Sequence, residues 1–264
     1  MIFVFGGSNK MKFFTFLKNR IKSTFSDIFK EITIPEYISW WVIRIMFIYA
    51  AIMHTDDRQR VLCLVNMLAL YAIPFFRFIF PKNSLFGCLS YRAQHIINIM
   101  EFFGSFLGNY IDMHSKVAKY DRILHYISGV AAVYAGYLIY KAILKKEHKE
   151  ESHSALLGST YGMCFSFMII PLWEITEFFG DFFYGTANQG YWYAPYDDDI
   201  FYRVFGHGAV TDGGQLPLWD TMMDMIDATV TTFASAIVLY IVLVIIDKHK
   251  KKKADAEKIE CKAA

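Results

Sequence analysis

The segment ALLGSTYGMCFSFMIIPLWEITEFFGDFF, residues 155–183, is mostly apolar and yet carries three carboxylates near its end. A run of about 20 apolar residues is long enough to cross the ~30 Å hydrocarbon layer of a membrane. The carboxylates of Glu174, Glu177 and Asp181 are spaced i, i+3 and i+7, which places them on one face of a helix. The segment therefore predicts a membrane-spanning helix with an acidic stripe.

The composition of the whole chain is typical of a membrane protein. Of its 264 residues, 55% are hydrophobic, 18% are aromatic and only 20% are charged, and the mean hydropathy is +0.28. Soluble domains carry about a quarter charged residues. The net charge of +2 gives no argument for a nucleic-acid partner. The four cysteines show no CxxC spacing, and we expect Cys63, Cys88 and Cys164 to be reduced packing residues.

Further apolar runs set the predicted architecture. The full set of runs is 37–53, 59–80, 93–112, 121–144, 155–183 and 221–247. We predict an all-α, polytopic membrane bundle of about six transmembrane helices, which occupy residues 37–247. In the preceding segment, 1–36, residues 10–33 alternate Phe, Leu and Ile with Lys and Arg at helical spacing, which is typical of an amphipathic helix on a membrane surface. Residues 248–264 form a basic tail.

The basic residues favour one orientation of this bundle. They gather before the first run, between the second and third, between the fourth and fifth, and after the last. With six spans these groups fall on one side, and the positive-inside rule assigns that side to the cytoplasm. We therefore expect both termini in the cytoplasm and an outer loop at 184–219, whose length is typical of lids or binding surfaces.

No basic residue precedes the apolar opening, so we expect no cleavable signal peptide, and Met11 is an alternative start.

Two more apolar runs carry stripes of ionisable residues. The run 121–144 opens with an aspartate and a histidine at i, i+4, and the run 221–247 is entered by three aspartates at i, i+4 and i+7. In the predicted topology all three stripes lie in the outer half of the membrane, so we expect them to converge on one pocket. The candidate residues are Asp121, His125, Glu174, Glu177, Asp220, Asp224 and Asp227.

Carboxylates in a membrane need partners. Each costs about 2.5–3.5 kcal/mol near the centre of a spanning helix, so these groups must face one another, water or a cation. One histidine with several carboxylates is a ligand set for a divalent cation such as Zn, Mn, Fe, Mg or Ca. A proton-sharing carboxylate cluster is the rival interpretation, and N-capping explains Asp121 and Asp220 equally well. We take Glu174, Glu177 and Asp224 as the candidate catalytic groups.

The order D-x3-H-x3-G, then WE-x2-E, then Gln followed by D-x3-D resembles the YjdF-like family of bacterial inner-membrane proteins. The residues that carry the resemblance are Asp121, His125, Gly129, Trp173, Glu174, Glu177, Gln215, Asp220 and Asp224. The resemblance covers about 95–245 and implies a bacterial inner-membrane location without an established reaction. The order is also distantly similar to the VanZ-like proteins, although this chain has Glu177 and Asp227 where that pattern favours Gln and Asn.

These patterns leave three classes of function open. The leading hypothesis is a membrane-embedded enzyme or binding protein whose acidic pocket holds a cation or shuttles a proton. Its substrate would be a lipid or a lipid-linked envelope intermediate, because the pocket opens at the outer leaflet. The second is a cation or proton transporter, which should show paired half-repeats that the sequence lacks. The third is a structural or accessory protein whose polar cluster only specifies helix packing.

Overall fold

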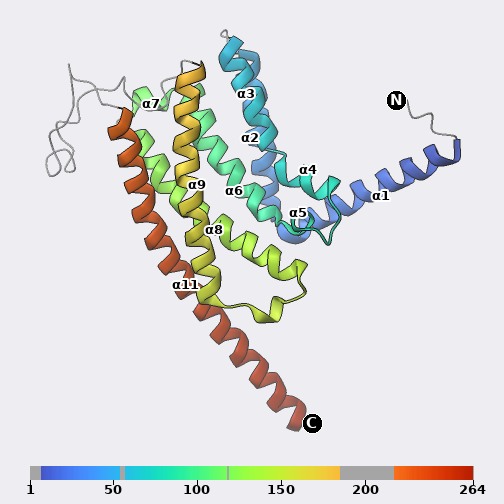
Figure 1. The fold of residues 1–264 in the computed structure, drawn as a ribbon. Helices are drawn as coiled ribbons and strands as arrows, with labels where there is room; N and C mark the ends of the chain where they lie inside the picture. Colours follow the sequence, from blue (N-terminus) through green and yellow to red (C-terminus); the bar gives the residue numbers. More distant parts are fainter. Residues whose placement is uncertain (1–6, 54–56, 118, 185–216, 264) are drawn as a thin grey trace. The chain divides into compact units, whose positions relative to one another are not determined.

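The computed structural model describes residues 7–53, 57–117, 119–184 and 217–263, which are almost entirely helical (Figure 1). These described residues contain no β-strand, which confirms the all-α prediction. The chain divides into two compact units. The first comprises Met1–Ile111 with Lys141–Ser152, and the second comprises Asp112–Tyr140 with His153–Ala264. Every residue that we expect in the acidic pocket belongs to the second unit.

Four described helices are long and apolar enough to cross a membrane. They are α2 (Ile34–Met53), α8 (Tyr120–Lys146), α9 (Ala155–Tyr184) and α11 (Pro217–Ala263). In α9 and α11 the candidate membrane spans are the shorter segments Ala155–Phe179 and Asp220–Ala256. The most apolar windows of these helices have mean hydropathies of 1.3 to 2.5. The length and the apolar composition of these helices are therefore those of a helical membrane protein.

The two remaining apolar runs do not form single long helices, so the count of six spans is not confirmed. The run 59–80 is divided between α3 (Asp57–Ala69) and α4 (Ala72–Ile79). The run 93–112 is divided between α6 (Tyr91–Glu101) and the π-helix η1 (Phe102–Tyr110). π-Helical turns are rare in proteins, and those that do occur are often found at functional sites.

Side chains from neighbouring helices hold the break between α3 and α4. Arg44 Nη2 donates to the carbonyl oxygen of Leu70 at 2.7 Å. Gln94 Nε2 donates to the carbonyl oxygen of Ala69 at 3.0 Å, and its Oε1 accepts from the backbone N–H of Ile73 at 2.8 Å. Unpaired backbone groups are costly in an apolar environment, so these bonds allow a helix to be interrupted there. They also give the buried Arg44 a structural role, since a cation is favourable at the C-terminus of α3.

The N-terminal helix α1 (Gly7–Glu31) is anchored to the first unit by its last turn. Glu31 accepts hydrogen bonds from Arg77 Nη1 at 2.7 Å, from Ser90 Oγ at 2.8 Å and from the backbone N–H of Tyr91 at 2.8 Å. Ser90 is the N-cap of α6, so Glu31 satisfies an orphan donor at the start of that helix. The short α5 (Leu85–Cys88) lies between α4 and α6 in the chain. That α1 lies on a membrane surface stays a prediction.

In the second unit, small residues allow the long helices to approach closely. A Cβ atom added to Gly129 of α8 would lie 2.7 Å from the carbonyl oxygen of Ala228 in α11. One added to Gly136 of α8 would lie 2.9 Å from the Cα atom of Gly162 in α9. Small residues at helix interfaces are the usual means by which membrane helices come into contact. The packing therefore brings both α9 and α11 against α8.

Two predicted segments, the outer loop and the basic tail, adjoin or belong to helix α11. The predicted outer loop 184–219 lies almost wholly outside the described residues, and α11 already begins at Pro217. The predicted basic tail, 248–264, continues α11 as helix through Ala263 (red in Figure 1).

The hydroxyl groups of Ser166 in α9 and Thr232 in α11 are buried and lie 2.7 Å apart, which joins these two helices.

Candidate metal centre

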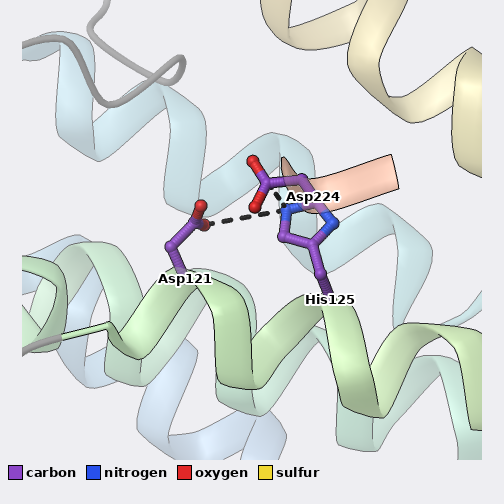
Figure 2. A group of neighbouring side chains, drawn as sticks. All are labelled: Asp121, His125 and Asp224. Carbon is purple, nitrogen blue, oxygen red and sulfur yellow. Dashed lines mark ion pairs between the residues drawn. The ribbon is translucent and has the colours of Figure 1, made fainter. Parts of the chain in front are cut away.

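The imidazole of His125 is the centre of the polar cluster in the second unit. Asp121 and His125 lie one turn apart on α8, and Asp224 comes from α11 (Figure 2). His125 Nε2 is 3.9 Å from Asp121 Oδ1 and 3.6 Å from Asp224 Oδ2. The side chains of His125 and Asp224 are only 6% and 1% exposed, so both are removed from water. Gly129 lies one turn beyond His125 and permits the approach of α11 that makes this meeting possible.

The carboxylates of α9 lie on the other side of the ring. Glu174 Oε1 is 3.8 Å from His125 Nδ1, and the Glu174 side chain is only 5% exposed. Within the described part of the chain, neither carboxylate oxygen of Glu174 has a hydrogen-bond partner. Glu177 lies one turn further along α9, and its Oε1 accepts a hydrogen bond of 2.7 Å from Trp173 Nε1. The indole thus fixes one oxygen of Glu177, whereas Glu174 interacts with the hydroxyl group of Thr221 in α11.

Among the residues that the structure describes, two groups of side chains have a geometry that can hold a metal ion. The first group is Asp121, His125 and Asp224, and the second group is His125, Glu174 and Glu177. Within each group the candidate ligand atoms all lie within 4.8 Å of one another. The two groups share His125. Five of the seven sequence-predicted residues are therefore brought together around one imidazole.

The distances in the first group suit a metal after small movements. Two ligand atoms bound at about 2.1 Å to a tetrahedral zinc ion lie about 3.4 Å apart. The separations from Nε2, 3.6 and 3.9 Å, exceed this value by only a few tenths of an ångström and are too long for hydrogen bonds. Asp224 Oδ2 is buried and has no hydrogen-bond partner among the described residues. The group therefore presents a nitrogen and two oxygens that do not bond one another.

The other two predicted residues lie outside both groups. Asp220 is buried in the first turn of α11, one turn before Asp224. Asp227 binds a cation of the protein itself: Arg122 Nε donates to its Oδ2 at 2.6 Å, and Arg122 Nη2 donates to its Oδ1 at 2.9 Å. Tyr126 Oη also donates to Asp227 Oδ1 at 2.9 Å. Asp227 therefore joins α8 to α11 as an ion-pair partner, and its metal-ligand role remains a prediction.

Arg122 and Tyr126 are functional-site neighbours that sequence reasoning missed. They follow Asp121 and His125 directly and repeat the same i, i+4 spacing on α8. That spacing is a signal, because an arginine in the first turn of an apolar helix also needs a partner. The order of residues along α8 does not reveal which aspartate of α11 faces which of its side chains.

N-capping alone does not explain Asp121 and Asp220. Asp121 is the second residue of α8, and Asp220 is the fourth residue of α11, so both lie inside the first turn. Asp121 also has a neighbour from outside the spans, because His114 Nδ1 in α7 (Met113–Lys116) lies 3.9 Å from Asp121 Oδ1. Burial lowers the pKa of His114, against the opposing charge of Asp121, and thereby favours the neutral imidazole. His207, Gln215 and the triplet 197–199 lie outside the described residues.

Comparison with known proteins found one family. The family model described as "Predicted membrane protein (DUF2238)" matches residues 36–244, which include all seven candidate residues. A search of curated proteins found no match. A search of solved structures also found none.

Proposed function

Since the chain belongs to the DUF2238 family of predicted membrane proteins, we propose that its second unit is a membrane-embedded divalent-cation centre. Asp121, His125 and Asp224 are the proposed ligands. The observation that carries the proposal is the meeting of two carboxylates from two helices at one imidazole nitrogen, at 3.9 and 3.6 Å, without hydrogen bonds to it. A cation there would offset the cost of burying these charges between apolar helices.

The proposed location is the bacterial inner membrane, with both termini in the cytoplasm. Two observations on the sequence support it: the distribution of Lys and Arg among the runs, and the YjdF-like order of motifs. In this proposal α3 with α4, and α6 with η1, complete the six spans as interrupted helices. The amphipathic helix α1 lies on the cytoplasmic surface. The cluster then lies in the outer half of the membrane, at the start of α8 and α11 and toward the end of α9.

We propose that the centre is an enzyme acting on a lipid or lipid-linked envelope substrate. The outer part of α9 exposes large apolar side chains beside the cluster, including Trp173, Phe178 and Phe182, which are 56%, 48% and 70% exposed. An amphiphile lying along such a surface brings its headgroup to the depth of Glu177. A bound cation would act as a Lewis acid toward that headgroup. Glu177, held by the indole of Trp173, is the proposed proton acceptor.

Elemental analysis of the protein purified in detergent tests the centre. The variants are His125→Ala and Asp224→Asn, and the control is Glu101→Gln, whose carboxylate accepts from Ser105 Oγ at 2.7 Å in the first unit. We expect near-stoichiometric metal in the wild type and in the Glu101→Gln control, and none in His125→Ala or Asp224→Asn. The unfolding temperatures of all four proteins should be comparable. A wild type that binds no metal after Zn, Mn, Fe, Mg and Ca have each been supplied would contradict the proposal.

Transport of a cation or proton is a second candidate function, and a polar stripe in the first unit favours it. Gln94 Nε2 donates to Asn98 Oδ1 at 2.7 Å on α6. Asn66 Nδ2 donates to Ser105 Oγ at 2.8 Å, and Ser105 in turn donates to Glu101. Proton relays of membrane proteins are built from Asp, Glu and His, and Glu101 is the ionisable member of this hydrogen-bonded group. Reconstituted vesicles with an internal pH- or metal-sensitive dye test it: flux in the wild type that Glu101→Gln abolishes is expected for a transporter, and its absence argues against one.

A packing-only role for the cluster remains the third candidate. In that case Asp224→Asn lowers the unfolding temperature while the wild type holds no metal. The same two measurements, metal content and unfolding temperature, therefore separate a packing role from a cation centre.

A further inference from the structure

The two ring nitrogens of His125 face different carboxylates. Nε2 is directed toward Asp121 and Asp224, the proposed ligands from α8 and α11. Nδ1 is directed toward Glu174 of α9, with 3.8 Å between Nδ1 and Oε1. A neutral imidazole carries its proton on one nitrogen only, and a metal binds the other. The identity of the group that faces Nδ1 therefore decides whether Nε2 has a lone pair to offer.

We propose that Glu174 is a positioning residue that accepts the Nδ1–H of His125 and so directs the Nε2 lone pair at the cation. This inference rests on the proposed cation centre. Metal-ligating histidines almost always donate their other N–H to a carboxylate, a carbonyl or a water molecule. Glu174 is a carboxylate that lies within 4 Å of Nδ1.

The surroundings of Glu174 leave it available for this bond. Both of its oxygens are buried, and none of the described residues lies at full hydrogen-bond distance from them. The hydroxyl group of Thr221 also interacts with this carboxylate, but a carboxylate accepts several hydrogen bonds, so that interaction and a bond from His125 are compatible. A shift of less than about 1 Å brings Oε1 from 3.8 Å into hydrogen-bond range of Nδ1. Because the carboxylate is 5% exposed, water does not compete strongly for it. A buried carboxylate in this position is otherwise costly, and the bond to His125 offsets part of that cost.

The second group of candidate ligands offers a rival role for Glu174. Together with Glu177 it would bind another cation on the Nδ1 side, with the imidazole between two ions. The two roles differ in stoichiometry and in their need for charge. A positioning residue leaves one ion per chain and needs only a hydrogen-bond acceptor, whereas a ligand gives two ions and needs the negative charge.

Titration of the metal-free, full-length protein in detergent with Co²⁺, followed by its visible absorption, tests the proposal. The variants are Glu174→Gln, which keeps an acceptor without charge, and Glu174→Met, which keeps the length without an acceptor. Thr176→Val is the matched control, because Thr176 is an exposed residue of the same turn whose hydroxyl group donates within its own helix, to the carbonyl oxygen of Leu172. Thermal unfolding of each variant monitors the fold.

We expect one Co²⁺ per chain in the wild type, in the control and in Glu174→Gln, with a loss of affinity of less than 10-fold in the last. Glu174→Met should lose about 10–100-fold, the usual effect of removing such a partner. Unchanged Co²⁺ affinity in Glu174→Met overturns the inference. Two Co²⁺ ions per wild-type chain, or a loss of affinity of more than 100-fold in Glu174→Gln, also overturns it. If Glu174→Met does not fold, Glu174→Gln still tests whether the negative charge is needed, and a loss of more than 100-fold in that variant overturns the inference. A wild type that binds neither Co²⁺ nor any of Zn, Mn, Fe, Mg and Ca instead refutes the cation centre itself.

Discussion

Arg122 of α8 binds Asp227 of α11 through two parallel contacts, Nε to Oδ2 at 2.6 Å and Nη2 to Oδ1 at 2.9 Å. The side chains are 11% and 1% exposed, so the pair lies away from water. It occurs beside the cluster because Arg122 follows Asp121 and Asp227 lies one turn after Asp224. The pair keeps the charge of Asp227 balanced within the protein and fixes α8 against α11.

Asp227→Ala should destabilise the fold without removing the metal. Taking one partner from a buried ion pair leaves an uncompensated charge and costs about 3–5 kcal/mol. The double variant Arg122→Met with Asp227→Leu should recover most of this loss, because neither charge remains. The measurement is unfolding in detergent, with metal content determined in parallel. Loss of metal from a well-folded Asp227→Asn variant would place Asp227 among the ligands instead.

Gly129→Ala should separate α8 from α11 and weaken metal binding. The added Cβ would lie 2.7 Å from the carbonyl oxygen of Ala228 and would also meet the side chain of Thr231, so the backbones must move apart. That movement separates His125 from Asp224, and we expect at least a 10-fold loss of metal affinity. The control is Gly104→Ala, where an added Cβ meets nothing within 4 Å. Equal affinities in the two variants would show that close packing at Gly129 does not set the site.

Gln94→Leu should destabilise the first unit through the break between α3 and α4. It leaves the carbonyl oxygen of Ala69 and the N–H of Ile73 without their partner. Each buried group left unpaired costs about 1–3 kcal/mol. Gln94→Glu keeps the acceptor for Ile73 and should be less harmful, which chemical denaturation of both variants can measure. Equal stability of the wild type and Gln94→Leu would mean that the break does not need this side chain.

Acid should remove the stabilisation that Glu31 provides. Burial opposes ionisation of Glu31, but the charge of Arg77 and the hydrogen bonds from Arg77, Ser90 and Tyr91 overcome it, and its pKa is lowered from the usual 4.5. A lowered pKa means that the contribution is fully present above pH 4.5 and is lost as the pH falls through the folded-state value. The difference in unfolding temperature between wild type and Glu31→Gln should therefore be constant above about pH 5.5 and shrink in acid. A difference that does not change with pH would exclude ionisation as its source.

The interruptions of the helices were not predictable from the runs of apolar residues. Hydropathy averages over about 20 residues, and the runs 59–80 and 93–112 are apolar on average. The break between Ala69 and Ala72 depends on Gln94 and Arg44, which are distant in the sequence and supply hydrogen bonds there. The helix α2 begins at Ile34, three residues before the predicted run 37–53. Thr33 and Glu36 form a capping box there, in which the Thr33 N–H donates to Glu36 Oε2 at 2.7 Å.

The sequence by itself determined which residues share a face. Asp121 with His125, Glu174 with Glu177, and Asp220 with Asp224 are neighbours on any α-helix, because the spacing of the helix repeat is fixed by the backbone. The apolar runs likewise determined that these faces belong to helices long enough for a membrane. These properties are local, so they can be read from one segment at a time.

Only the tertiary structure decided which faces meet. The i, i+3 spacing puts Asp224 and Asp227 on the same stripe, yet the first faces His125 and the second binds Arg122. That choice depends on the rotation and approach of α11 against α8, which the missing side chain of Gly129 permits. In the same way the packing of α9 set Glu174 against Nδ1 rather than Nε2. Contacts between helices depend on the packing of many side chains at once, and no single segment of the sequence contains that information.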